Sequence, residues 1–261
     1  MMKYLFGDGD IAARRLEVVA EVFADPTRAF LLDAVTKTPK LVVDLGCGPG
    51  YTTQLLADVL GCDHAAGLDK SEHFVSLARK TETVSFYLHD VTSVPFPVGP
   101  CDLIHCRFLL THLKEPRAVV AKWATQLRPK GLLLMQETEW INTDNDVFAA
   151  YLDVVEAMLA DQKTELYVGR VLERMEVRGG LKRRVSRVRP FRVANRDAAT
   201  MFLMNMQSWK DSSYIRENRP SRLIEEIEAN LHGLRKQPSS VKEIEWGLRE
   251  IVCERTEDGP G

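Results

Sequence analysis

A glycine-rich segment directly after a short apolar run carries the strongest chemical signal in the sequence. The run 40–45 is followed by glycines at 46, 48 and 50, and Asp44 stands two residues ahead of the first of them. Glycines let a backbone turn tightly and approach a ligand without an intervening Cβ. Dinucleotide sites use the spacing GxGxxG and hold a diphosphate at a helix N-terminus. The spacing GxGxG with a preceding aspartate suits a ligand with a cationic end better.

Acidic residues also follow the next two apolar runs. Asp69 ends the run 65–69, and Asp90 comes just after the run 84–88. Because open α/β sheets bind ligands at the carboxyl ends of their strands, both carboxylates are expected near the glycine segment. A carboxylate there can accept hydrogen bonds from two hydroxyl groups. Two plainer interpretations stay open: Asp69 could cap a helix together with Ser71, and Asp90 could belong to an ordinary turn at a strand end.

The stretch 43–50, Val-Asp-Leu-Gly-Cys-Gly-Pro-Gly, resembles the first motif of class I S-adenosylmethionine-dependent methyltransferases almost residue for residue. The specific likeness runs from Asp44 to about Glu137 and is looser beyond. It implies S-adenosylmethionine (SAM) as cofactor, with Asp69 on the ribose hydroxyls, Asp90 accepting from the adenine amino group and Val91 packing on the ring. The cofactor-binding residues so implied are Tyr4, Asp44, Gly46, Cys47, Gly48, Gly50, Asp69, Lys70, His89, Asp90, Val91, Cys106 and Arg107.

Two candidate catalytic residues follow the fourth apolar run. The segment 106–113 resembles the Arg-x-x-Leu-x-His-Leu stretch of many small-molecule members of this family. Methyl transfer needs an in-line nucleophile, exclusion of water and, for an acceptor that must lose a proton, a base. Histidine titrates near physiological pH, so His112 is interpreted as a base or acceptor-positioning group, or else as a residue packed at the sheet edge on a backbone carbonyl. Arg107 either binds an acceptor oxygen or pairs with an acid in a structural or cofactor-shell role.

The acceptor is expected to lie against His112, Glu137, Trp140 and Tyr167. Trp140 could stack on a planar acceptor or serve packing only, and Tyr167 lies in an insertion that carries acceptor specificity in relatives. The segment around Tyr4 and the first helix resemble a lid over SAM, or form a surface helix pair. No Asn/Asp-Pro-Pro-Tyr motif follows the fourth run, which argues against methylation of DNA adenine.

The pattern of apolar residues predicts the elements that position these groups. Helical spacing in 9–36, broken at Asp25-Pro26, predicts two amphipathic helices. Strands are expected at 40–45, 65–69, 84–88, 101–106 and 132–137, the last after a turn at 128–131, with helices opening at 52–56 and covering 71–80 and 116–127 between them. A long helical stretch at 146–175, a strand at 182–193, helices at 197–209 and 221–234 and a last strand at 246–254 follow.

Strands separated by helices at this rhythm predict an α/β fold, a doubly wound and mostly parallel seven-stranded sheet with right-handed crossovers. One domain is expected. Its parts are N-terminal lid helices (1–38), a SAM-binding core (39–140), a helical insertion after the fifth strand (141–180) and a C-terminal part of the sheet and helices (181–261).

Composition excludes several classes of protein. The 261 residues are 45% hydrophobic and 28% charged, as in ordinary folded domains. A net charge of -2 gives no global attraction to nucleic acid or anionic lipid, and no run approaches the ~20 apolar residues of a membrane span. The cysteines (Cys47, Cys62, Cys101, Cys106 and Cys253) lack metal-site spacing, so reduced thiols and no metal are expected. We expect a cytoplasmic monomer or homodimer acting on a small molecule.

An arginine-rich stretch at 182–189 gives the main competing interpretation. Such density can track a phosphate backbone, which would suit an RNA- or protein-modifying methyltransferase. The plainer interpretation is an edge strand whose charges discourage aggregation. A third possibility is a SAM-binding protein without catalysis, since methyl transfer requires no obligatory catalytic signature.

Overall fold

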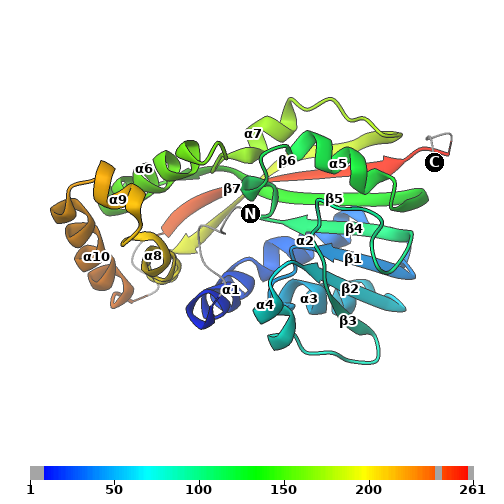
Figure 1. Ribbon diagram of the computed structural model, residues 1–261, viewed down its shortest axis with the longest axis horizontal. Helices are drawn as coiled ribbons and strands as arrows, with labels where there is room; N and C mark the ends of the chain where they lie inside the picture. The colour runs from blue at the N-terminus through cyan, green and yellow to red at the C-terminus, as the bar shows by residue number, and fades with distance from the viewer. Residues whose placement is uncertain (1–8, 239–242, 258–261) are drawn as a thin grey trace.

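The computed structural model describes residues 9–238 and 243–257, and its centre is a seven-stranded sheet flanked by helices (Figure 1). The strands are Leu41–Leu45 (β1), His64–Asp69 (β2), Val84–Leu88 (β3), Cys101–Arg107 (β4), Leu127–Asn142 (β5), Leu181–Ala194 (β6) and Glu243–Arg255 (β7). Their spatial order is β3-β2-β1-β4-β5-β7-β6. The pairs among β1 to β5 are parallel, and β7 is antiparallel to both of its neighbours. The predicted α/β fold with a mostly parallel seven-stranded sheet is confirmed.

Helices cover both faces of the parallel part of the sheet, which explains why its strands are almost continuously apolar. Ala24–Ala34 (α2) and Tyr51–Leu60 (α3) lie on one face, where Phe30 and Leu56 pack with strand residues such as Val42. Pro116–Ala124 (α5) and Val168–Glu173 (α7) lie on the other, where Trp123 and Leu172 are buried. The short helix Glu72–Leu77 (α4) follows β2.

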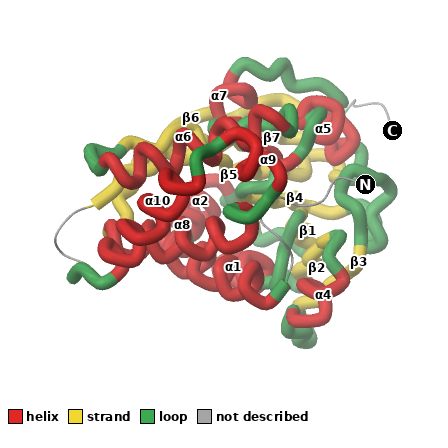
Figure 2. Tube along the Cα trace, turned by 60° about the vertical axis from the view of Figure 1, so that its left-hand side comes forward, coloured by secondary structure: helices red, strands yellow, loops and turns green. Residues whose placement is uncertain are grey.

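A second group of helices packs at the extended ends of β5, β6 and β7. These helices, here called the helical cap, are Asp146–Asp161 (α6), Asn195–Trp209 (α8), Ser213–Asn218 (α9) and Ser221–Arg235 (α10). The N-terminal helix Asp10–Val22 (α1) packs against α8, and α8 against α10 (Figure 2). Tyr151 of α6 stacks on Phe202 of α8, with ring centroids 4.2 Å apart. The cap thus has a core of its own, and α1 connects it to the parallel sheet.

Several predicted boundaries are wrong for identifiable reasons. The expected single helical stretch at 146–175 is two helices, because the chain turns after α6 with Lys163 at φ 59°, while apolar residues continue at helical spacing across the break. The helix α9 was not predicted, since it has only six residues and begins at the Ser212 cap. The expected turn at 128–131 is an irregularity inside β5, where Lys130 has φ 64°. No helix in 9–238 or 243–257 has the length and apolar character to cross a membrane.

Candidate functional site

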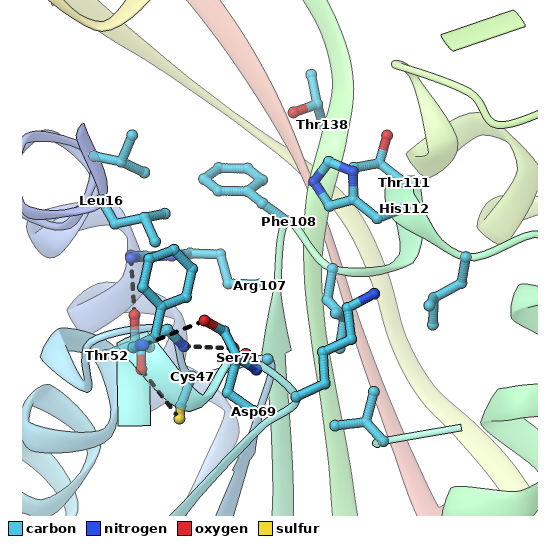
Figure 3. A pocket seen from close by; sticks show the side chains of 18 of the residues that line it. Leu16, Cys47, Thr52, Asp69, Ser71, Arg107, Phe108, Thr111, His112 and Thr138 are labelled. Carbon is cyan, nitrogen blue, oxygen red and sulfur yellow. Dashed lines mark hydrogen bonds between the residues drawn. The ribbon is translucent and has the colours of Figure 1, made fainter. Parts of the chain in front are cut away.

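One cavity of about 1300 Å³ connects the glycine segment with the helical cap. Figure 3 shows part of its wall, with Asp69, Phe108 and His112 labelled. At one end it is lined by the carboxyl ends of β1, β2 and β3 and the residues that follow them. At the other end it is lined by side chains of α1, α6, α8 and β7. The loop after β4 lies in its wall as well, and carries Phe108 and His112. The cavity therefore reaches from the switch point of the sheet, where α/β folds bind ligands, into the cap.

The glycine turn needs glycine for its backbone conformation. Gly46 and Gly48 have φ values of 66° and 54°, in the left-handed region that side chains disfavour. A Cβ on Gly46 would also lie 2.7 Å from a methyl carbon of Leu109. Both glycines and Cys47 line the cavity, whereas Gly50, the N-cap of α3, packs toward Phe86 and does not.

Asp44 does not face the cavity. Its side chain is 2% exposed, accepts a hydrogen bond from Thr53 Oγ1 at 2.8 Å and is paired with His105 Nδ1 at 3.1 Å. The buried carboxylate thus ties β1 to α3 and β4 beneath the turn. The expectation of an acid directed at a cationic ligand from this position is corrected, because an alternating strand residue just before the turn points into the fold.

Asp69 lies at the end of β2 beside the turn. Its two carboxylate oxygens accept from the backbone N–H groups of Gly48 (2.9 Å) and Ser71 (2.8 Å). Burial raises the pKa of Asp69, and these two hydrogen bonds oppose that shift. The cap of α4 is Ser71, whose hydroxyl accepts from Phe74 N. Each oxygen of Asp69 retains a second lone pair, so the carboxylate can accept further hydrogen bonds in the cavity.

The segment after β3 lines the same end of the cavity. Asp90 accepts from the N–H and hydroxyl of Thr92 at 2.9 and 2.8 Å, so it occupies the strand-end turn considered above and lies in the cavity wall as well. Burial raises the pKa of Asp90, but the two Thr92 hydrogen bonds and the nearby positive charge of Lys70 together lower it, and the net shift is downward. Val91 is buried, and the His89 ring nitrogen Nε2 lies 3.0 Å from Ser93 O. Lys70 also lines this end.

The loop after β4 is held by a buried carboxyl group. Glu137 Oε1 accepts from the N–H groups of Leu109 and Leu110 at 2.9 and 2.8 Å, and burial raises its pKa to about 8. The loop forms a short 3-10 helix, Leu110–His112 (η1), that places His112 in the cavity wall. Burial, followed by the charges of Arg15 and Lys70, lowers the pKa of His112 to about 3. The imidazole is therefore neutral at physiological pH.

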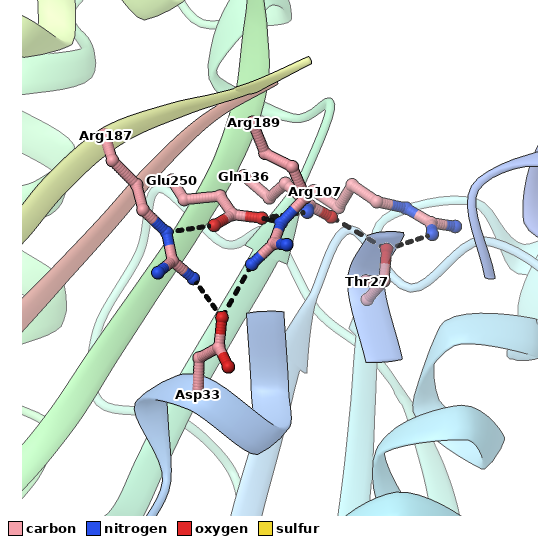
Figure 4. A network of polar contacts seen from close by, with 7 residues as sticks. All are labelled: Thr27, Asp33, Arg107, Gln136, Arg187, Arg189 and Glu250. Carbon is pink, nitrogen blue, oxygen red and sulfur yellow. Dashed lines mark hydrogen bonds and ion pairs between the residues drawn. The ribbon is translucent and has the colours of Figure 1, made fainter. Parts of the chain in front are cut away.

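Arg107 belongs to a chain of polar groups that runs from strand β4 through β5 to β7 (Figure 4). Its guanidinium donates to Thr27 Oγ1 and Thr52 Oγ1, each at 2.9 Å. Thr27 donates to Gln136, whose amide in turn donates to Glu250. Burial lowers the pKa of Arg107 to about 10, so it remains a cation. Of the two roles considered for Arg107, these contacts favour the structural one at the cavity wall.

Residues 42–131 match the family model described as methyltransferase domain. A protein of Streptomyces fradiae, described as an uncharacterized 37.1 kDa protein in a transposon, is 33% identical over 119 residues, 43% of this chain and 34% of its own length. A trans-aconitate 2-methyltransferase of Rhizobium leguminosarum bv. trifolii is 28% identical over 111 residues, 42% of this chain and 43% of its own. Residues 42–131 therefore carry a class I S-adenosylmethionine-dependent methyltransferase domain. The matched part spans less than half the length of either relative.

Solved structures share the fold of this methyltransferase domain well beyond the matched segment. A structure from Anaeromyxobacter dehalogenans, described as a candidate type II methyltransferase, has a TM-score of 0.58 and 16% identity and covers 88% of this chain and 94% of its own. A [4+2]-cyclase has a TM-score of 0.50 and 15% identity, and the match covers 98% of this chain and 88% of the cyclase. At such low identities the likeness shows the fold alone, so the chemistry must be inferred from the residues of the site.

Some predicted site residues of the methyltransferase domain do not reach the cavity. Cys106 is buried within the sheet, and Glu137 faces the loop after β4. Trp140 packs over Gly247, where a Cβ would lie 2.2 Å from its ring, and Tyr167 stacks with the Arg170 guanidinium. None of these four lines the described cavity. Tyr4 lies outside the described residues.

Other cavity-lining residues were not predicted. They come from α1, the loop after β4, α6, α8 and β7, and they include Arg15, Leu16, Phe108, Tyr151, Phe202, Asn205 and Trp246. The one available signal was a polar residue, Asn205, on an otherwise apolar helix face. Nothing in the spacing indicated that segments so distant from the glycine turn would meet it.

The arginine-rich strand β6 forms one edge of the seven-stranded sheet. Arg187 and Arg189 both pair with Asp33 and with the fully buried Glu250, at 2.6 to 2.7 Å (Figure 4). Arg183 donates to three backbone carbonyls near α7. These arginines bind protein groups, as expected of a stabilised edge strand, and this weakens the case for a phosphate-tracking surface.

Proposed function

We propose that this domain transfers a methyl group from SAM to an oxygen, nitrogen or carbon of a small organic acceptor. The observation that carries the proposal is the continuity of one cavity: it begins at the glycine turn and the carboxylates of Asp69 and Asp90, passes His112 and ends in the helical cap. A cofactor and a second molecule can therefore lie end to end in it. In-line displacement requires that arrangement.

The residues present suit the cofactor. The turn at Gly46, Cys47 and Gly48 offers a surface without bulky side chains for the methionine part. Asp69 keeps lone pairs for the ribose hydroxyls, and Asp90 offers a carboxylate for the adenine amino group above the apolar Val91. SAM, when bound, supplies a methyl group on a sulfonium: the acceptor would bond to the methyl carbon, and the sulfur would leave as the thioether of S-adenosylhomocysteine.

His112 is the side chain best suited to handle the acceptor. Because its imidazole stays neutral, it can accept a hydrogen bond from an acceptor hydroxyl or amine. Because its pKa is about 3, His112 is a weak base that does not hold a proton at physiological pH. Its main contribution is therefore to orient the acceptor. The apolar side chains of the cap exclude water from the transfer position, which protects the reaction from hydrolysis.

A small acceptor fits the structure better than an RNA or protein one. The cavity ends in the helical cap, where α6, α8 and β7 supply its wall, and the arginines of β6 are engaged in ion pairs. The similarity to trans-aconitate 2-methyltransferases supports the same choice.

Calorimetric titration with SAM tests the proposal. We expect micromolar binding by the wild type and a loss of about tenfold or more in Asp69→Ala, because that carboxylate touches both the turn and the ribose position. Asp63→Ala is the matched control, an exposed aspartate just before the other end of the same strand, and it should bind SAM normally. Formation of S-adenosylhomocysteine with a metabolite extract tests catalysis. Absence of SAM binding by the wild type would overturn the proposal.

A further inference from the structure

The far end of the cavity, in the helical cap, has a different chemistry from the glycine end. Its wall consists mainly of apolar and aromatic side chains. Among them are Val19, Phe23, Leu152, Val155, Phe202 and Trp246. Phe23 packs edge-to-face on Trp246, and Phe202 packs on the same tryptophan at a tilt, each with ring centroids 5.9 Å apart. A flat apolar molecule is the natural occupant of such a wall.

A polar cluster interrupts this apolar wall. Arg15 of α1, which is 5% exposed, donates from Nη1 to Asn205 Oδ1 of α8 at 2.6 Å. The hydroxyl of Tyr151, on α6, lies beside Asn205, and burial raises its pKa so that it stays protonated. The charge of Arg15 acts on both Tyr151 and His112. Arg15 and Asn205 both line the cavity, so the guanidinium lies in its wall at the place where α1 meets α8.

The other cations in the cavity wall have their contacts elsewhere in the cavity. Lys70 follows directly after Asp69 and its charge acts on Asp69 and Asp90 as well as on His112. Lys122 donates to Thr92 O at the glycine end. Arg107 donates to two threonine hydroxyls, and Lys114 is exposed. Arg107 also reaches the apolar end, where its Nη1 lies 3.4 Å from Phe23 O, but its guanidinium is held by the two threonines. Among the described cations that line the cavity, Arg15 is the one that bonds a side chain of the helical cap, Asn205.

Resting on the proposed function, we propose that the acceptor is a largely apolar, ring-containing molecule with a single carboxylate or equivalent oxyanion, and that Arg15 selects for that group. A guanidinium matches one carboxylate through two parallel hydrogen bonds. Further carboxylates would be desolvated against apolar walls without a partner, which is costly. The domain should therefore discriminate against tricarboxylates such as trans-aconitate, in contrast to what the names of its relatives suggest.

Titrations in the presence of saturating S-adenosylhomocysteine test the inference with three probes. These are 1-naphthoate (an apolar ring system with one carboxylate), 1-naphthylmethanol (its neutral analogue) and trans-aconitate (three carboxylates without an apolar body). We expect 1-naphthoate to bind about tenfold more tightly than either of the others, the factor for one good charge-assisted contact. In Arg15→Met this preference over 1-naphthylmethanol should vanish while SAM affinity is kept.

The matched control is Arg14→Met, the neighbouring arginine on the exposed side of α1, which pairs with Glu17 and should leave all three affinities unchanged. The comparison of probes on the wild type holds even if Arg15→Met does not fold. Equal or tighter binding of trans-aconitate, no preference for 1-naphthoate, or a preference that survives in a folded Arg15→Met would overturn the inference while leaving SAM binding intact. Failure of the wild type to bind SAM would overturn the proposed function as well.

Discussion

The carboxylate of Asp69 accepts a hydrogen bond of 2.9 Å from the backbone N–H of Gly48, a residue 21 positions earlier in the chain. This contact fastens the glycine turn to the end of the neighbouring strand. A ligand that also binds Asp69 would therefore meet a turn already in place, with less conformational entropy to lose. The shape of the turn itself rests on its glycines.

Gly46→Ala should destabilise the fold more than Gly61→Ala. Both glycines have positive φ, 66° and 58°, but a Cβ on Gly46 would meet Leu109 at 2.7 Å, whereas nothing lies within 4 Å of one on Gly61. We expect losses of ~1 kcal/mol for Gly61→Ala and ~2–4 kcal/mol for Gly46→Ala in urea unfolding. Equal losses would mean that backbone strain alone determines the requirement for glycine at position 46.

Glu137→Gln should change how stability depends on pH. A carboxyl group whose pKa rises from 4.5 to about 8 on folding binds its proton more tightly when folded. Its contribution to the free energy of unfolding therefore falls as pH rises through that window. Relative to the variant, which keeps an acceptor oxygen for Leu109 and Leu110, the wild type should lose ~2–4 kcal/mol between pH 5 and pH 8. Exposed Glu82→Gln serves as control, and parallel pH profiles for wild type and Glu137→Gln would refute the assignment.

The value of kcat/KM should not fall near pH 6.5 through protonation of His112. Because the pKa of His112 is about 3, the imidazole is already neutral across pH 5 to 8, and kcat/KM should not follow its titration there. His112→Ala should lower kcat by about tenfold to a hundredfold through loss of acceptor orientation, with SAM affinity unchanged. His64→Asn, far from the cavity at the start of β2, is the control. A wild-type inflection near pH 6.5 that disappears in His112→Ala would show a titrating base instead.

Arg189→Gln should destabilise the fold more than Arg192→Gln on the same strand. Arg189 pairs with the fully buried carboxylate of Glu250, whereas Arg192 makes only exposed contacts of 3.8 to 3.9 Å with Glu243 and Glu245. With Arg187 still bound to Glu250, we expect a loss of ~1–3 kcal/mol for Arg189→Gln, against ~0–0.5 kcal/mol for the exposed pair. Chemical denaturation measures both. Equal effects would mean that the network of Figure 4 adds little stability.

The local chemistry of the glycine end could be predicted from sequence because its parts are short and regular. A buried strand, a glycine turn and an acid after each following strand must gather at one edge of a parallel sheet, and Asp69 and Asp90 do line one cavity there. The inward direction of Asp44 depends on its partners His105 and Thr53, which sequence spacing does not reveal.

The far end of the cavity could not be predicted in the same way. Arg15, Tyr151 and Asn205 come from three helices, and they meet only because α1 and α6 pack against α8 in the helical cap. Helical periodicity predicts which face of a helix is buried, but not which other helix covers it. A tertiary structure is needed to see that a buried arginine lies in the wall of a cavity.

Electron density from crystals soaked with S-adenosylhomocysteine tests the central claim most directly. The account predicts density along the glycine turn, with the ribose hydroxyls on Asp69, the adenine beside Asp90 and Val91, and the sulfur directed toward His112 and the helical cap. Density at another place, or a ligand in the cavity that leaves Asp69 and the glycine turn without contacts, would contradict it.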